Sequence, residues 1–557
     1  MKNRIFPKIL ALAAVVLFAA LAAGQQTQPA PSATNPTFSA RTELVLVPAV
    51  VTDHNGHVTG LTKDDFIVQE NGVEQKLATF EEVKATAQRM YRVSTAGQRE
   101  YSNTHFTDYA PRRINIIVLD TINTPILDQT RAKQELVKFL TSSVSSQDLT
   151  SLLVLTRGGV RVVHDFTADP NVLVQALRKV KGRVDVMSGE NTDAVAESIG
   201  NDQAGVEAAD LLSAIDQAES QLTQMMQENA IDATLDGFDA IANAFRGVPG
   251  RKALIWVSGG FPFHVDRPGD TVPNRFMDRY ERFFQKLNDA NISMYPIDAR
   301  GLVVTALSAA DSLTSASGRR MNPTAVMRGR TTQNQATIDT LNSFADMTGG
   351  RAFYNTNDLA HAITRAADDS SSYYLLGYYV KSNEGKPGWR KISVKVRRGG
   401  VSVRARSGYY ATADHMTDPE QLRRRDIAEA VRSPFDFTAV PMTVHIVGFQ
   451  PAAENKKNVL FEVTLPPNSL QIDNADNNHM NFQFVAVAHD ASGKTAGDAS
   501  QEIDGHLKPE TVQKIGTTGF LYRNLITVPP GEYSVKFVVR DNVSGRVGSL
   551  SAPVTVQ

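Results

Sequence analysis

The stretch Arg113-Ile114-Asn115-Ile116-Ile117-Val118-Leu119-Asp120 decides the fold of the central part of the chain. It is apolar almost throughout, so a strand made of these residues has no face suited to water. Similar apolar runs lie at 151–156, 253–257 and 292–297, and amphipathic stretches lie at 128–143, 170–180, 205–247 and 275–290. Buried strands that alternate with helices predict a parallel sheet with helices packed on both faces.

Two further features complete the expected α/β domain, residues 112–371. The long amphipathic stretch 205–247 has apolar residues at helical spacing, and we expect it to pack on the sheet, with projection as an interaction arm as the alternative. The small, polar stretch 305–336 is expected to form a surface loop. A helix at 337–348, a strand at 352–354 and a helix at 358–370 are predicted to close the domain.

Segments with strand patterns flank this domain on both sides. Residues 40–85 and 372–411 are each too short to be stable alone, so we predict that they pack together as one small β-sandwich unit. Polar residues 86–111 read as a linker and residues 412–434 as a helical linker. The end of the chain, 435–557, shows regular short strands and turn signals, which predict an immunoglobulin-like β-sandwich.

The N-terminus predicts export. Lys2, Arg4 and Lys8 precede an apolar run at 9–23, and a small residue, Gly24, follows it. This order is typical of a signal peptide, predicted here as 1–24 and cleaved after Gly24, whereas a membrane anchor needs ~20 apolar residues. Residues 25–39 read as a disordered linker. We therefore expect a secreted or periplasmic protein without a membrane span after cleavage.

Composition excludes several classes of function. The 557 residues carry 58 Lys+Arg and 59 Asp+Glu, a net charge of −1, so nothing favours binding to nucleic acid. The chain contains no cysteine, which excludes disulfides, thiolate metal sites and a thiol nucleophile.

Polar side chains follow three of the predicted buried strands. In an open parallel sheet, ligands bind beyond the carboxyl ends of the strands. The expected partner-binding residues are therefore those at these ends, namely Asp120, Asn123, Thr124, Ser258, Phe261 and Asp298.

All three of these strand ends carry recognisable motifs. The start Asp120-Thr121-Ile122-Asn123-Thr124, the block Gly250–Gly260 (GRKALIWVSGG) and the stretch Tyr295–Gly301 (YPIDARG) resemble von Willebrand factor type A (vWA) domains. The resemblance is closest to VWFA-related secreted proteins of acidobacterial type, and it extends over about 40–410. It implies a fold class of multidomain α/β plus all-β. In that class, a vWA-type doubly wound, mostly parallel sheet is inserted in a small β-sandwich unit, and an Ig-like β-sandwich follows.

The resemblance also implies a site for Mg²⁺ or Mn²⁺ that bridges to an acidic residue of a partner protein. Asp120, Thr124, Thr234 and Ser258 match the metal-ligand positions of that family. Ile122 stands where the family has an oxygen ligand, and Ser258 replaces a carboxylate. A hard cation prefers several oxygens, so this degenerate motif predicts no resident cofactor, with Mg²⁺ or Mn²⁺ as the alternative.

The residues favour recognition over catalysis. We expect a non-enzymatic binding protein whose partner is another protein. One alternative is a structural scaffold with no working ligand site. The other is a hydrolase that uses Ser258, but a nucleophile elbow needs glycine two residues on each side, and position 256 is Trp. Phosphate-loop and dinucleotide fingerprints are also missing from the sequence.

Overall fold

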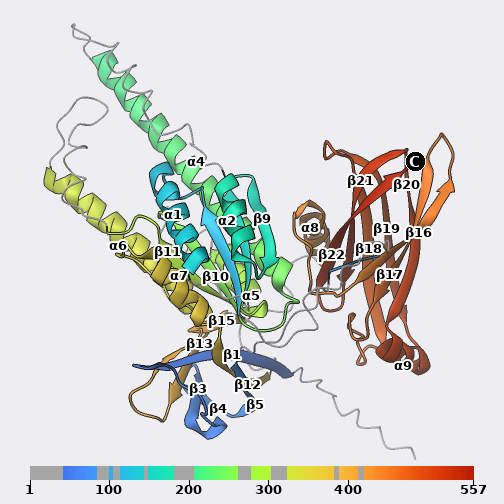
Figure 1. Cartoon of the computed structure of the whole chain (residues 1–557), viewed down its shortest axis with the longest axis horizontal. Helices are drawn as coiled ribbons and strands as arrows, with labels where there is room; N and C mark the ends of the chain where they lie inside the picture. The colour runs from blue at the N-terminus through green and yellow to red at the C-terminus, as the bar shows by residue number, and fades with distance from the viewer. Residues whose placement is uncertain are drawn as a thin grey trace, which may run out of the picture.

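The computed structural model describes residues 42–84, 100–103, 113–142, 148–180, 206–260, 277–302, 323–381, 388–411 and 419–557 (Figure 1). The predicted signal peptide, the 25–39 linker and Phe261 lie outside these residues. Among the described helices, none is long and apolar enough to cross a membrane.

A mixed five-stranded sheet lies at the centre, with strand order β11-β10-β7-β8-β9. Its parallel strands are β7 (Ile114–Asp120), β8 (Leu149–Thr156), β10 (Lys252–Ser258) and β11 (Ile292–Asp298). Strand β9 (Gly159–Thr167) forms an edge and runs antiparallel to β8. Every residue of β7, β10 and β11 is buried, as the apolar sequence of these strands requires.

Helices cover both faces of this sheet. On one face lie α1 (Ile126–Ser142), α2 (Pro170–Lys179) and α7 (Leu359–Asp368), packed around Leu136, Leu173 and Ile363. On the other face lie α4 (Val206–Phe245), α5 (Met277–Asp289) and α6 (Pro323–Thr348). The rings of Phe238 and Phe344 from α4 and α6 pack there on Trp256 of β10, at centroid distances of 5.2 and 5.6 Å.

Two sequence-based expectations about these helices are wrong. Residues 323–336, expected as a loop, are the first half of α6, and α4 does not pack along its whole length. Forty helical residues span ~60 Å, whereas a seven-residue strand such as β10 spans only ~23 Å. The N-terminal half of α4 therefore extends past the sheet (Figure 1), where Leu222 and Met225 are 47% and 62% exposed.

Strands from residues 42–84 and 372–411 share sheets. In one sheet, β12 (Ser372–Lys381) pairs with both β1 (Thr42–Asp53) and β5 (Leu77–Lys84). In the other, β13 (Gly388–Val396) pairs with β3 (Phe66–Glu70). The shorter elements are β2 (Gly56–His57), a 3-10 turn (Lys63–Asp65), β4 (Val73–Gln75), β14 (Ser402–Arg404) and β15 (Gly408–Ala411). The two segments enclose one apolar core, which includes Val47, Phe66 and Tyr374.

The C-terminal part forms two antiparallel four-stranded sheets around a second core. The first sheet contains β20 (Phe520–Val528), β17 (Lys457–Leu465), β16 (Thr443–Pro451) and β6 (Glu100–Ser102). The second contains β19 (Thr495–His506), β18 (His479–His489), β21 (Gly531–Asp541) and β22 (Val547–Val556). A short helix, α9 (Pro509–Thr518), connects β19 to β20. Strand β6 lies within the segment expected to be a linker.

The expected fold class is wrong. Strand residues outnumber helical residues in the described part of the chain, and four of its five sheets are antiparallel. Within the described ranges, the one sheet with parallel pairs is mixed, so no doubly wound parallel sheet of the vWA type is seen there. The expectation failed because the turn at Gly158 and Gly159 sends the chain back beside β8, and the polar residues of β9 hid that strand.

Helix α8 (Pro419–Arg432) links the mixed sheet to the C-terminal sheets. Its Glu429 accepts a hydrogen bond of 2.7 Å from Asn243 of α4, and its Asp426 accepts two from the buried Arg540 of β21. Nearby, the Thr438 hydroxyl donates to Ala244 O and accepts from Gly247 N at the end of α4. These contacts fix the C-terminal sheets to the α4 side of the mixed sheet.

Lys252, at the start of β10, is a buried lysine whose ammonium donates to Val248 O (2.5 Å) and Gly250 O (2.9 Å). Burial lowers the pKa of Lys252 to about 7, well below the ordinary lysine value of 10.5. Between these two pH values the unfolded chain binds more protons, so the stability due to this group rises with pH and is lost as pH falls through 7.

We predict that wild type gains about 3 kcal/mol of stability relative to Lys252→Met between pH 7 and pH 9.5. Denaturant unfolding at both pH values measures the difference. Lys138→Met, at an exposed position on α1, serves as the control and is expected to show no such gain. A parallel pH response of wild type and Lys252→Met would contradict a depressed pKa.

Asn103 holds β6 against the C-terminal sheets. The side chain is 4% exposed; its Nδ2 donates to Phe437 O (2.7 Å) and Val440 O (3.0 Å), and its Oδ1 accepts from Met442 N (2.8 Å). Loss of these bonds leaves buried backbone groups unpaired.

We predict that Asn103→Ala costs about 2–4 kcal/mol and that Gln450→Ala, on the exposed side of neighbouring β16, costs little. The measurement is hydrogen exchange of the β16 amides in denaturant, because β16 is the strand that pairs with β6. Equal exchange rates in the two variants would show that β6 is dispensable.

Candidate functional site

Asp120 ends β7 at the carboxyl edge of the mixed sheet and is fully buried. Its Oδ1 accepts hydrogen bonds from the backbone N–H groups of Ile122 (2.8 Å) and Asn123 (3.0 Å). Its Oδ2 accepts from Asn123 Nδ2 (2.8 Å), Ser258 Oγ (2.9 Å) and Trp256 Nε1 (3.1 Å). All five donors are neutral, so no cation offsets the burial, and burial raises the pKa of Asp120.

Asn123 connects this carboxylate to helix α4. Its Nδ2 group also donates to Thr234 Oγ1 (3.0 Å), and the Thr234 hydroxyl donates to Ala230 O one turn earlier in α4. A single amide nitrogen thus bridges two oxygens, those of Asp120 and Thr234, that the sequence proposed as metal ligands.

The loop after β7 packs tightly against the loop after β10. Thr124 Oγ1 accepts from Gly259 N (2.8 Å), and Ser258 Oγ lies 2.9 Å from Gly260 O. A Cβ atom at Gly259 would come within 2.9 Å of Pro125 and 3.0 Å of the Thr124 backbone, so this contact requires glycine. The Ser258 hydroxyl has one proton for two acceptors, Asp120 Oδ2 and Gly260 O.

Asp298, at the end of β11, is paired within its own loop. Its carboxylate accepts from Arg300 Nε (2.9 Å), Arg300 Nη2 (2.7 Å) and the Arg300 backbone N–H (3.0 Å). The guanidinium group also reaches Asn334 Oδ1 of α6. Such a two-pronged pair fixes both side chains, so Asp298 holds Arg300 in place.

An exposed rim lies beside the Asp298–Arg300 loop, and we call it the Leu127–Leu302 rim, after its two apolar residues. Arg131 of α1 donates to Arg300 O (3.0 Å) and to Asn357 Oδ1, and Asn357 Oδ1 also accepts from Leu302 N (3.1 Å). Leu127 lies one helical turn before Arg131, on the same side of α1. Leu127 is 81% and Leu302 is 55% exposed.

Gly301 makes this rim possible. Its φ of +73° is unfavourable for other residues, and a Cβ atom there would meet Arg131 Nη1 at 2.5 Å and Asn357 Oδ1 at 2.6 Å. The hydrogen bonds around Arg131 therefore hold two apolar side chains in solvent on a rigid backbone.

The residues present do not fit a divalent cation. Asp120 already accepts five hydrogen bonds, the Asn123 amide nitrogen lies between Asp120 and Thr234, and Ile122 offers no oxygen. Arg300 takes both oxygens of Asp298, another carboxylate at this edge. Across the described residues, no group of three or more His, Asp or Glu side chains is arranged to hold a metal.

Nor does the geometry support Ser258 as a nucleophile. Its hydroxyl is buried and points to Asp120 and Gly260 O, and in the described residues no histidine bonds to it. His361 lies near the start of α7, where its backbone N–H donates to Asp358, and His264 lies outside the described residues. A serine next to an acid without a base between them lacks the means to lose its proton.

The structure brings most of the predicted site residues together. Asp120, Asn123, Thr234 and Ser258 form one hydrogen-bonded group, and Thr124 supports its loop, whereas Asp298 pairs with Arg300 instead. Asp120, Thr124, Ser258 and Asp298 are buried, so in this conformation they position the edge and cannot touch a partner. Sequence reasoning missed Trp256, Arg300 and the rim. Trp256 could have been found, because it lies two residues before Ser258 and so on the same face of β10.

Comparisons with known proteins add little. No protein-family model and no curated protein matches the chain. Among solved structures, the conserved hypothetical protein BatB from Bacteroides thetaiotaomicron aligns with 45% of this chain and 96% of its own, at 14% identity and a TM-score of 0.21. A β-glucuronidase of glycoside hydrolase family 2 aligns with 33% of this chain and 17% of its own, at 10% identity and a TM-score of 0.14. Such low scores carry no argument, and the family resemblance stays a prediction.

We predict that Asp120→Ala destabilises the chain by about 3 kcal/mol or more, because it strands five buried donors. Asp128→Ala, at a partly exposed position in α1, is the matched control and is expected to cost much less.

Neither Mg²⁺ nor Mn²⁺ is expected to bind wild type in calorimetric titrations. The triple variant Ile122→Ser/Asn123→Ser/Ser258→Asp is the positive control. It removes the Asn123 amide that bridges Asp120 and Thr234, and it adds oxygen ligands at positions 122 and 258. Measurable heat of Mg²⁺ binding to wild type, abolished by Asp120→Asn, would show that these residues do hold a divalent cation.

Proposed function

We propose that this chain is an exported, non-enzymatic recognition protein that binds another protein, without metal, through the Leu127–Leu302 rim. The observation that carries the proposal is the exposure of Leu127 and Leu302, at 81% and 55%, on a backbone fixed by hydrogen bonds. Single exposed leucines are ordinary on protein surfaces, but two held on one rigid rim form a preorganised apolar contact.

The charges of the rim complement this apolar pair. Arg300 is partly exposed and has its carboxylate partner beneath it, so it can still offer guanidinium edges to a partner. Arginine and apolar anchors together are typical of interface centres. The buried Asp120 group supports the loop that leads into α1, on which Leu127 lies.

One structural observation favours the scaffold alternative. The mixed sheet, α8 and the C-terminal sheets are joined by buried polar contacts such as the Arg540–Asp426 pair, which would suit a rigid spacer. In that case, changes on the rim would have no effect on any interaction of the exported protein.

Site-specific cross-linking separates the two functions. We predict that a photo-reactive phenylalanine analogue at position 127 of the full exported chain gives a discrete cross-linked protein in intact cells. Leu302→Asp should abolish this product, because a carboxylate in an apolar contact costs desolvation. The control places the same analogue at Val447, another exposed apolar position, in the C-terminal sheets. Absence of the product, or the same product from both positions, would favour the scaffold.

A further inference from the structure

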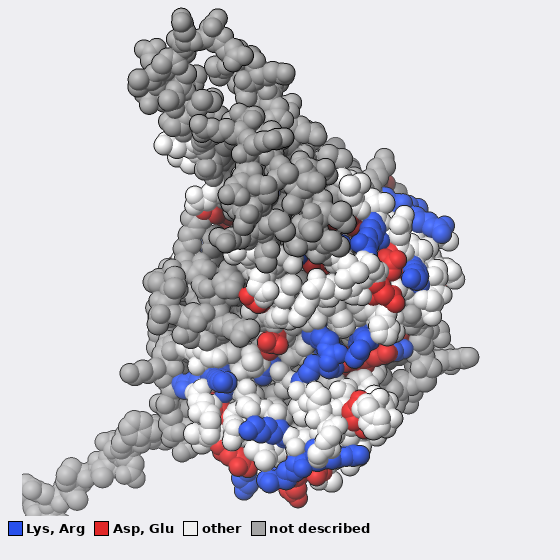
Figure 2. Space-filling model, turned by 90° about the vertical axis from the view of Figure 1, so that its left-hand side faces the viewer, with Lys and Arg blue, Asp and Glu red and all other residues white. Residues whose placement is uncertain are grey.

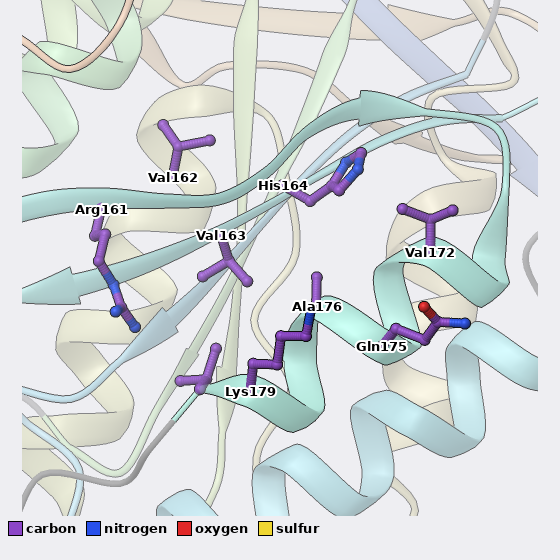
Figure 3. A pocket seen from close by; sticks show the side chains of 9 residues that line it. Arg161, Val162, Val163, His164, Val172, Gln175, Ala176 and Lys179 are labelled. Carbon is purple, nitrogen blue, oxygen red and sulfur yellow. The ribbon is translucent and has the colours of Figure 1, made fainter.

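A groove lies at the opposite side of the mixed sheet, between its edge strand β9 and helix α2 (Figure 3). It has a volume of about 350 Å³. Its strand side consists of four consecutive residues, Arg161 to His164. Since consecutive strand residues alternate between faces, a cavity that touches all four runs along the edge of β9.

The helix side of the groove follows one face of α2. Val172, Gln175, Ala176 and Lys179 line it, at spacings of three, four and seven residues from the first, and Val180 closes its end. Seven helical residues rise ~10 Å, which equals the length of about three residues of extended chain. The groove therefore has the length of a short peptide strand.

The lining is apolar in the middle and basic at its rim. Val163, Val172 and Ala176 provide the apolar surface, and Arg161 and Lys179 are exposed beside it. Figure 3 shows Arg161 and Val163 extending from β9 toward α2, and Ala176 and Lys179 extending from α2 toward β9. Figure 2 shows one face of the molecule, on which blue and red side chains are interspersed among white ones.

Neither cation of the groove is neutralised within the described part of the chain, where no carboxylate lies within ion-pair distance of Arg161 or Lys179. His164 is also there, and its Nδ1 lies 2.6 Å from Asp165 O, which leaves Nε2 for another partner. Two cationic side chains around an apolar slot complement an acidic ligand with small apolar groups.

The edge of β9 supplies the remaining element. Within the described residues β9 pairs with β8 alone, so half of its backbone N–H and C=O groups have no strand to bond with. An extended peptide can add to such an edge, gaining affinity from backbone hydrogen bonds and specificity from side-chain pockets.

We propose that the groove between β9 and α2 binds an extended, acidic peptide segment of a partner protein as an added strand on β9. Apolar side chains of the peptide enter the slot at Val163 and Ala176, and its carboxylates contact Arg161 and Lys179. This site is distinct from the Leu127–Leu302 rim, and it does not depend on the function proposed there.

The test uses the full exported chain and two pools of fluorescein-labelled peptides, each about seven residues long. One pool alternates Val, Ile or Leu with Asp or Glu, and the other replaces the acids by Lys. We expect the acidic pool to bind at least about tenfold more tightly in fluorescence anisotropy, with an affinity that falls as salt rises. Equal binding of both pools, or binding of neither, would overturn the proposal.

A matched pair of variants tests the groove itself. Lys179 and Arg178 are both exposed cations in the last turn of α2, but only Lys179 lines the groove. Lys179→Glu should weaken the acidic pool at least about tenfold, and Arg178→Glu less than about twofold. Equal losses would mean diffuse charge attraction and would overturn the proposal. Ala176→Trp, which fills the slot, should also abolish binding at unchanged thermal stability.

Backbone pairing and self-association need their own readouts. An acidic pool with N-methylated alternate amides cannot donate to the edge, so it should bind at least about tenfold more weakly. Equal affinity would overturn strand addition. Sedimentation of wild type and Ala176→Trp should give the same mass; a wild-type dimer that the variant dissociates would show that a second copy fills the groove, and would overturn the proposal of an acidic partner.

Discussion

The buried carboxylate of Asp120 is the constraint on which the carboxyl edge of the central sheet depends. An ion in the interior without a counter-charge is very costly unless hydrogen bonds replace its water. Here the replacement comes from strand β10, through Trp256 and Ser258, and from the loop after β7, through Asn123 and the backbone N–H of Ile122. The Trp256 ring also packs between Phe238 and Phe344, so the core of the α4–α6 face and the polar edge share one side chain.

Much of the secondary structure follows from local sequence pattern. The pairing of strands, and the extension of α4 past the sheet, do not. The buried strands β7, β8, β10 and β11 can be predicted from sequence, because a strand covered on both faces must be apolar throughout. Strand β9 is half exposed and carries Arg161, His164 and Asp165, so it lacks the continuous apolar run that marks the other strands of this sheet. Strand β6 has only three residues, Glu100 to Ser102, and exists because β16 pairs with it. No local signal identifies a strand that its partner creates.

The candidate site divides in the same way. Rules about strand ends identified Asp120, Asn123 and Ser258, because chain direction brings the ends of parallel strands together, and the family resemblance added Thr234. Those rules give no partner for a side chain. Asp298 looks equivalent to Asp120 in sequence, yet Arg300 pairs with it two residues later, whereas Asp120 has only neutral donors. The chemistry of each carboxylate is thus decided by neighbours that the motif does not contain.

Burial also decides which residues are able to recognise a partner. The polar groups that the sequence predicts as site residues hydrogen-bond to one another or to neighbouring groups, and most lie beneath the surface. They can therefore act only by fixing the backbone. Contact falls to their exposed neighbours, which in sequence look ordinary: Leu127 and Leu302 at the carboxyl edge, and Arg161 and Lys179 beside β9. A rigid polar interior and unremarkable surface residues above it are two parts of one arrangement, because an apolar side chain stays exposed in a fixed position only when the backbone below it cannot collapse.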